Sequence, residues 1–207
     1  MSLGSQTVQQ SRRETNRVHN RDAIMAAARE VFTELGFGAT TVRDIIRRTN
    51  LASGTFYNYF DSKEDVFKAL NDEIGDHLRG ALRQVRAEAE TVEEFLQRSF
   101  ETYFGYYLEN PEAYYLMRAN PDIDAFASRI TGEQEQAGLN EMRADIEKAV
   151  DSGSVPEIDV GYLTACLGGV AFSMLDELMQ REPIDVAHAT RFAVRLFMAG
   201  VTGLRDA

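Results

Sequence analysis

The chain has 207 residues, of which 44% are hydrophobic and 27% charged, as is ordinary for a globular protein with one large or two small domains. Its single cysteine, Cys166, excludes an internal disulfide framework, and its longest uncharged run, residues 160–175, is shorter than the roughly 20 residues of a membrane span. The formal net charge of -11 is uneven, because residues 1–60 carry +3 and the rest carry -14, so an anionic partner stays compatible with the first part.

Helical periodicity runs through almost the whole chain, without a convincing alternating strand, and predicts an all-α fold. Residues 1–19 are polar, lack a secretory signal and are expected to form a disordered basic arm whose first residues resemble an expression scar. A single cysteine fits a reducing compartment. Together with the missing secretory signal, it predicts a cytoplasmic protein. The first helix is expected to begin near Asn20 and to stop at Gly36.

A second helix is expected after Thr40 or Thr41, because Asp44 follows Thr41 at the spacing of a capping box. Its predicted end is Asn50, a residue type that tolerates the left-handed conformation of a tight turn. A short third helix is expected over residues 53–60. Two helices joined by a turn of three to four residues are typical of a helix-turn-helix motif.

The third helix has two phenylalanines four residues apart, Phe56 and Phe60, which share a face and should point to the core. Asn58 and Gly54 then lie on the opposite face. An asparagine can pair with a base edge there, and small or hydroxylated neighbours can approach a DNA groove. The alternative is an ordinary amphipathic helix with two surface tyrosines.

Further helices are expected to about residue 90, then over about 91–110, 112–119, 122–150, 159–181 and 185–203, roughly nine in all. Two polar segments with prolines, residues 151–159 and 181–185, read as linkers. The predicted organisation is a small DNA-binding unit over residues 20–66 and a larger helical unit over residues 67–207.

Residues 36–70, GFGATTVRDIIRRTNLASGTFYNYFDSKEDVFKAL, closely resemble the DNA-binding domain of the TetR family of bacterial transcriptional regulators. The likeness reaches back to about Arg21 and covers about 50 residues. One departure is Asn50, which stands where the family usually has a glycine and which can adopt the same conformation. The resemblance implies an N-terminal three-helix DNA-binding domain and a larger helical domain for ligand binding and dimerisation.

The resemblance also implies roles for single residues. Thr41 and Arg43 would contact phosphate or the groove edge, Tyr57, Asn58 and Tyr59 would form the reading face, and Lys63 would hold a phosphate. The full predicted DNA-binding set is Thr41, Arg43, Ser53, Gly54, Thr55, Tyr57, Asn58, Tyr59 and Lys63. The implied partner is a double-stranded, near-palindromic operator, and the implied activity is that of a repressor released by a small effector.

An aromatic stretch marks the larger unit, since residues 95–126 hold nine of the chain's 20 aromatic residues. Two interpretations stay open, a thick aromatic core or a pocket for an apolar or aromatic effector. Arg118 or Asn120 could anchor a polar group of that effector. The predicted lining residues are Tyr103, Phe104, Tyr107, Tyr115, Met117, Arg118 and Phe126.

The last two long helices, about 159–181 and 185–203, carry small and apolar residues at helical spacing. Family resemblance implies that they form a four-helix bundle with the same helices of a second copy, giving a homodimer. The alternative is the core of one monomer. The residues that carry this prediction are Ala165, Gly168, Gly169, Ala171, Phe192, Leu196, Ala199 and Gly203.

Catalysis is not expected. The chain has three histidines and shows neither a His/Cys cluster with metal-ligand spacing nor a glycine-rich phosphate loop, so no enzyme activity, metal or cofactor is predicted. For the larger unit an alternative stays open, namely control by a protein partner without any small effector.

Overall fold

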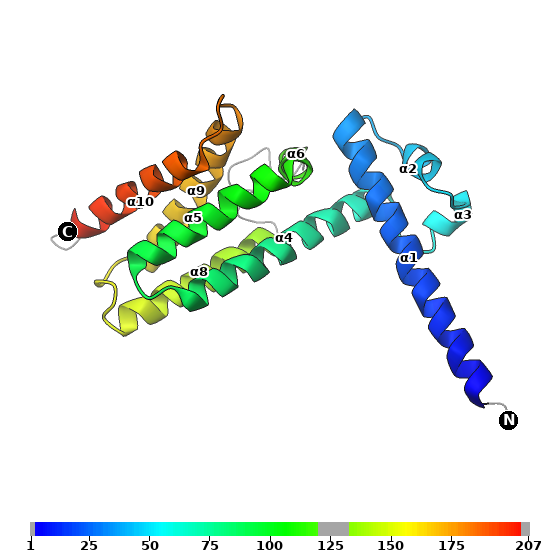
Figure 1. Cartoon of the computed structure of the whole chain (residues 1–207), viewed down its shortest axis with the longest axis horizontal. Helices are drawn as coiled ribbons and strands as arrows, with labels where there is room; N and C mark the ends of the chain where they lie inside the picture. Colours follow the sequence, from blue (N-terminus) through cyan, green and yellow to red (C-terminus); the bar gives the residue numbers. More distant parts are fainter. Residues whose placement is uncertain (1–2, 120–132, 204–207) are drawn as a thin grey trace. The chain divides into compact units, whose positions relative to one another are not determined.

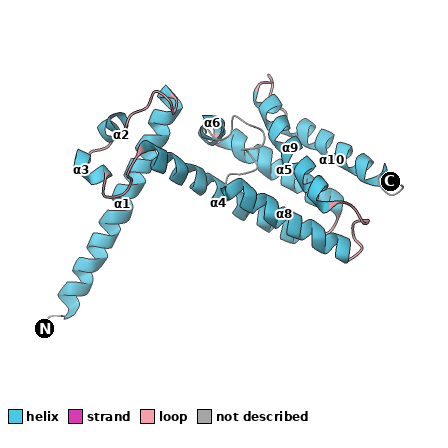
Figure 2. Cartoon of the chain, turned by 180° about the vertical axis from the view of Figure 1, so that it is seen from behind, coloured by secondary structure: helices cyan, strands magenta, loops and turns pink. Residues whose placement is uncertain are grey.

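The computed structural model describes the backbone of residues 3–119 and 133–203 (Figure 1). No strand occurs in these two ranges (Figure 2), and the all-α prediction is confirmed. The helices are α1 (Leu3–Leu35), α2 (Val42–Arg48), α3 (Ser53–Phe56), α4 (Lys63–Glu88), α5 (Val92–Glu109), α6 (Pro111–Ala119), α8 (Glu133–Asp151), α9 (Val160–Met179) and α10 (Val186–Gly203).

The chain divides into two compact units. Unit 1 comprises Met1–Glu73 and Glu112–Ile123, and unit 2 comprises Ile74–Pro111 and Asp124–Ala207. The division lies within α4, later than the boundary after residue 66 that the sequence suggests. Among the described residues, no helix combines the length and the hydropathy that a membrane crossing requires.

Helix α1 is longer than the sequence suggests, since it begins at Leu3 instead of near Asn20. The structure therefore differs from the expected disordered arm over residues 1–19 wherever it describes that segment. The segment has no proline and is rich in glutamine and arginine, which lose little side-chain freedom in a helix. Residues 14–19 are exposed, so their polarity reflects a solvated helix. The predicted stop is confirmed, because Gly36 has a φ of 76° and donates its N–H to the Phe32 carbonyl at 2.9 Å.

The core of unit 1 is aromatic where α1, the following turn and α4 meet. The rings of Phe32, Phe37 and Phe67 form a triangle with centroid distances of 5.5, 5.4 and 4.5 Å. Helix α2 packs against α1 and α3, and its Ile45 is fully buried. The small helices α2 and α3 are thus held by tertiary burial.

Helix α2 begins as the capping-box pattern predicts, with Thr41 as the N-cap and Asp44 at the third helical position. Its end differs from the prediction, because no non-glycine residue in the described part has a positive φ and Asn50 is therefore not left-handed. Thr49 closes the turn: its Oγ1 donates to the Ile46 carbonyl at 2.9 Å and accepts the Leu51 N–H at 3.2 Å. The Thr49 side chain therefore stabilises the turn that a left-handed Asn50 was expected to form.

Helix α3 is shorter than the expected residues 53–60, since it ends at Phe56. Turn hydrogen bonds continue the coil, with the Tyr59 and Phe60 N–H groups both donating to the Phe56 carbonyl, at 2.9 and 3.1 Å. The inward orientation predicted for Phe56 and Phe60 is confirmed, because they are 1% and 7% exposed.

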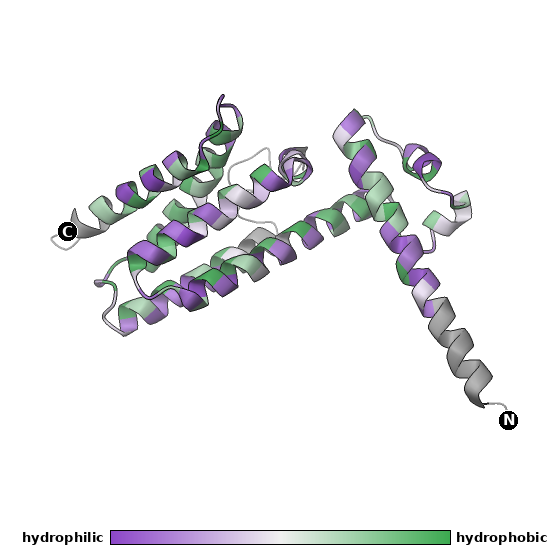
Figure 3. Cartoon of the chain, in the orientation of Figure 1, coloured by the Kyte–Doolittle hydropathy of each residue, from purple (hydrophilic) through white to green (hydrophobic). Residues whose placement is uncertain are grey.

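Unit 2 is built around α5, α9 and α10, and α8 packs along α9. The Phe100 ring stacks near Phe104 and Phe197, with centroid distances of 5.6 and 6.0 Å, and so joins α5 to α10. Figure 3 shows hydrophobic and hydrophilic residues alternating along α4 and α10, as expected of helices with one buried and one exposed face.

Candidate nucleic-acid interface

The surface formed by α3 and the turn after it presents small and hydrogen-bonding groups. Ser53, Gly54, Tyr57 and Asn58 are exposed, and Thr55 and Tyr59 are half-buried. No atom lies within 4 Å of the position that a Cβ on Gly54 would take. The backbone here is open to close approach by another molecule.

Contacts with α1 fix the far end of this surface. The Asn20 side-chain amide donates to the Tyr59 hydroxyl at 3.3 Å, and the Arg21 guanidinium lies 5.5 Å from the centre of the Phe60 ring. Tyr59 is thus partly engaged within the protein, whereas Tyr57 and Asn58 point outward. Sequence reasoning missed the role of Asn20, because a partner 39 residues away leaves no local signal.

Thr41 and Arg43 stand at the start of α2, and both are exposed. The Thr41 hydroxyl donates to Asp44 Oδ2 at 2.5 Å and accepts the Asp44 N–H at 3.3 Å. These Thr41 hydrogen bonds, first the side chain's and then the backbone's, lower the pKa of the Asp44 carboxyl. The capping box therefore keeps Asp44 ionised, and the Asp44 carboxylate offsets part of the positive charge of Arg43.

The arginines at the end of α2 differ in availability. Arg48 forms ion pairs with Glu34 and Glu30 of α1, and its hydrogen bond to Glu34 lowers the pKa of that carboxyl. The Arg47 side chain is 63% exposed and lies 3.9 Å from Asp44. Arg48 therefore braces α2 on α1, while Arg43 and Arg47 keep their side chains in solvent, where a phosphate could be met.

Lys63 has a different environment from the one the resemblance implies. Its ammonium donates to the carbonyls of Phe37 at 2.8 Å, Thr40 at 2.9 Å and Gly38 at 3.4 Å. It also lies 4.6 Å from the centre of the Phe37 ring. An ammonium has three N–H donors, so these carbonyls occupy them all. A phosphate contact by Lys63 stays a prediction, and in this structure the residue joins α4 to the turn before α2.

The residues predicted to line an effector pocket fall in both units. Tyr103, Phe104 and Tyr107 lie on α5 in unit 2, where the Tyr103 and Tyr107 rings are 5.2 Å apart. Phe104 and Tyr107 are buried. On α6, in unit 1, Met117 is buried, whereas Tyr115 and Arg118 are exposed. Asn120 and Phe126 lie outside the described residues.

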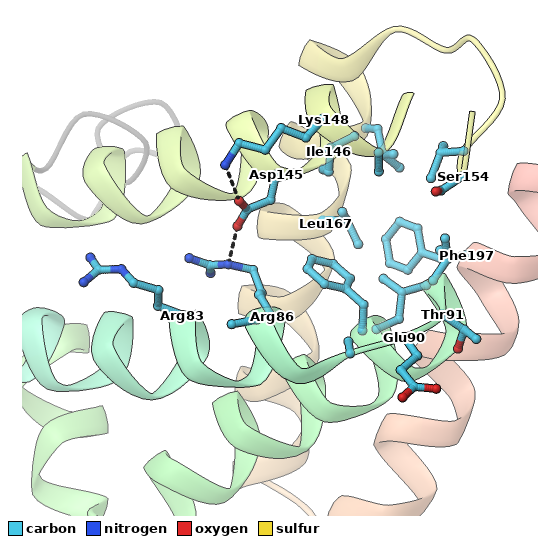
Figure 4. Close-up of a pocket in the computed structure, with 18 residues that line it drawn as sticks. Arg83, Arg86, Glu90, Thr91, Asp145, Ile146, Lys148, Ser154, Leu167 and Phe197 are labelled. Carbon is cyan, nitrogen blue, oxygen red and sulfur yellow. Dashed lines mark hydrogen bonds and ion pairs between the residues drawn. The ribbon is translucent and has the colours of Figure 1, made fainter. Parts of the chain in front are cut away.

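A cavity of about 500 Å³ lies in unit 2, at the end of α4 and the start of α5 (Figure 4). Helices α8, α9 and α10 and the segment after α8 complete its wall. None of the described residues from the predicted set lines it. Its lining residues are Arg83, Arg86, Ala87, Ala89, Glu90, Thr91, Val92, Phe95, Leu96, Asp145, Ile146, Lys148, Ala149, Ser154, Val155, Leu163, Leu167 and Phe197.

The residues of the predicted dimer interface are mostly accessible in one chain. Phe192 and Leu196 are 57% and 49% exposed on α10, Ala165 and Ala199 are exposed, and Gly169 and Ala171 are half-buried. Gly168 differs, since a Cβ there would meet the Leu139 side chain at 2.8 Å. It serves close packing of α9 on α8. Gly203 is the last residue of α10.

No group of three or more histidine, cysteine or acidic side chains within the described ranges could hold a metal ion. The surface built by α2, α3 and the turn after α3 instead has the layout of a helix-turn-helix, with a buried anchor and an outward reading face.

Comparison with known proteins agrees with this geometry. Residues 24–70 match the family described as bacterial regulatory proteins, tetR family. The chain is 34% identical over 85 residues to the HTH-type transcriptional repressor KstR2 of Rhodococcus jostii, a match that spans 39% of this chain and 42% of that protein. It is 29% identical over 189 residues to KstR2 of Mycolicibacterium smegmatis, spanning 88% of this chain and 90% of the relative.

Among solved structures, the chain resembles the transcriptional regulator FadR of Bacillus subtilis in complex with stearoyl-CoA. The TM-score is 0.73 at 21% identity, covering 84% of this chain and 95% of that one. At this identity the likeness concerns the fold, which extends through both units. The relatives are named as transcriptional regulators. From its helix-turn-helix, its all-α fold and these matches, the chain belongs to the TetR family of bacterial transcriptional regulators.

Proposed function

We propose that this regulator is a homodimeric repressor that reads a near-palindromic operator and is released from it by a small, largely apolar effector. The exposed surface of Gly54, Tyr57 and Asn58, held in place by buried Phe56, carries the proposal. The repressor names of the two KstR2 relatives support the direction of control. The stearoyl-CoA complex of the FadR neighbour supports an effector with a large apolar part.

Release by an effector follows from linkage between two sites. A ligand that binds better to a conformation unsuited to the operator must lower operator affinity by the same factor. Helix α4 is continuous from Lys63 to Glu88 and belongs to both units, so it is one covalent route between a ligand and the DNA-binding surface. Ligand contact by the aromatic residues of α5 and α6 stays a prediction within this proposal.

The division of labour at the DNA surface is testable on the DNA that flanks the protein's own gene, after footprinting has located the operator. Asn58→Ala is expected to weaken operator binding by about 5–150-fold, which corresponds to a lost base contact of 1–3 kcal/mol, and to leave binding to random duplex unchanged. Arg43→Ala is expected to weaken both and to reduce the slope of log K against log salt by about 0.9. Equal effects of the two substitutions on operator and random DNA would contradict this division.

The dimer through α9 and α10 rests on the exposed apolar side chains of Phe192 and Leu196, which are four residues apart on one face of α10. Leu196→Glu is expected to place a charge in the interface and give a monomer at micromolar concentration in size-exclusion chromatography with light scattering. Leu108→Glu is the matched control, because Leu108 is an exposed leucine on α5. A dimeric Leu196→Glu variant would show that Leu196 lies outside the interface. A monomeric Leu108→Glu variant would show that the interface includes α5.

A further inference from the structure

The cavity of unit 2 has one apolar side and one charged end (Figure 4). Leu96, Leu167 and Phe197 in its wall are 4%, 6% and 9% exposed, so they form a side that water reaches poorly. Ile146 and Val155 extend this apolar wall. A volume of about 500 Å³ lies within the range of small-molecule sites, about 300–1,000 Å³.

The charged end is built by α4 and α8. The Arg86 side chain is 8% exposed, its Nε lies 2.7 Å from Asp145 Oδ2, and its Nη2 donates to Glu141 Oε2 at 3.0 Å. Arg83 donates to the other Glu141 oxygen at 2.6 Å, and Lys148 Nζ lies 3.4 Å from Asp145. The hydrogen bond from Arg83 lowers the pKa of Glu141, which keeps that carboxylate charged.

This cluster has three cations and two carboxylates, and therefore one positive charge in excess within a chain of net charge -11. Glu90, the other acidic residue of the lining, directs its carboxylate away from the cluster in Figure 4. The Arg86 guanidinium is buried at this end of the cavity, and its Nε is paired with Asp145. A ligand anion at this end would be attracted by the one positive charge in excess.

We infer that this cavity binds an apolar monoanion, such as a carboxylic acid with a hydrocarbon body. The body lies against Leu96, Leu167 and Phe197, and the acidic group lies beside Arg86 and Lys148. A neutral molecule of the same shape would leave the excess charge unmatched, and a cation would be repelled by it. This inference rests on the proposed function for its biological meaning, since it names the class and the site of the effector.

A series of probes with one chain length and three charges tests the class. Dodecanoate, dodecanol and dodecylamine are titrated at low salt, below their aggregation concentrations, into the full-length protein in a calorimeter. Dodecanoate is expected to bind at least tenfold more tightly than dodecanol, and dodecylamine more weakly than both. Equal affinities of the three, or no binding of dodecanoate, would overturn the inference.

Two variants test the site. Ala149→Phe fills the cavity from a half-buried position and is expected to abolish binding of all probes. Lys148→Glu turns the excess charge from +1 to -1 and should remove most of the preference for dodecanoate. Because the Lys148 side chain is 77% exposed, the chain should still fold. Arg86→Met is less suitable, since it leaves Glu141 and Asp145 without a buried partner.

Arg143→Glu is the matched control, because Arg143 is an exposed arginine on the same helix outside the lining. It is expected to leave dodecanoate binding unchanged. If Ala149→Phe binds normally while Tyr107→Ala does not, the ligand lies on the aromatic residues of α5 and the inferred site is wrong. Operator affinity in the presence of dodecanoate is measured separately. Binding in the cavity without any change in operator affinity would support the site and contradict the proposed release mechanism.

Discussion

Replacing Phe56 with alanine is expected to lower the free energy of unfolding of unit 1 by about 3–5 kcal/mol and to abolish operator binding. The Phe56 ring is 1% exposed and packs 6.1 Å from Phe60 and 5.3 Å from Tyr57 between ring centres. Helix α3 has four residues, and its N-cap, Ala52, provides no side-chain hydrogen bond. A helix this short has little stability of its own, so buried Phe56 must hold it in place.

The neighbouring residue gives the matched control. Tyr57→Ala removes a side chain that is 58% exposed, and we expect a change in unfolding free energy within about 0.5 kcal/mol together with weaker operator binding. Urea unfolding followed by circular dichroism measures stability, and fluorescence anisotropy with labelled operator measures binding. A Phe56→Ala variant that keeps wild-type stability would show that Phe56 does not hold α3 in place. A Tyr57→Ala variant that binds the operator normally would show that Tyr57 does not contact DNA.

Local patterns predicted the features of the DNA-binding surface that depend on near neighbours. The capping box of Thr41 with Asp44 spans three residues, and the stop at Gly36 needs a single conformation. The inward orientation of Phe56 and Phe60 follows from helical spacing. The hydrogen-bonded turns after α3 keep the two side chains on the same face. For such features the cause lies within one turn of the chain, and the sequence displays it directly.

Features that depend on distant partners were not accessible in this way. Nothing near Arg48 indicates that Glu34 and Glu30, which are 14 and 18 residues earlier, will form ion pairs with it. The cavity of unit 2 draws its wall from five helices and two connecting segments, so no stretch of sequence contains it. The aromatic stretch was the more visible signal, although part of it, Phe100 and Phe104, forms core packing in α5.

Lys63 is where the family pattern and the structure lead to different expectations. As a phosphate contact it would act through its charge, and as the residue that holds three carbonyls of the turn before α2 it would act through position. Lys63→Met keeps an unbranched apolar stem near Phe37 and removes the three donors. We expect stability to fall by at least about 2 kcal/mol, because one hydrogen bond to a charged group contributes about 1.5–3 kcal/mol and Lys63 donates three.

For DNA binding, the positional role predicts a loss of about tenfold in operator affinity at every salt concentration, with an unchanged slope of log K against log salt. The turn leads directly to Thr41 and Arg43, so its displacement would misplace both without altering the number of phosphates contacted. Lys68→Met removes the same charge from α4 at an exposed site paired with Asp72 and should leave both affinity and slope nearly unchanged. If the slope of log K against log salt falls by about 0.9 in Lys63→Met and not in Lys68→Met, Lys63 contacts a phosphate in the complex. The carbonyl contacts would then describe the protein before it meets DNA, and the lysine would have to exchange them for the operator.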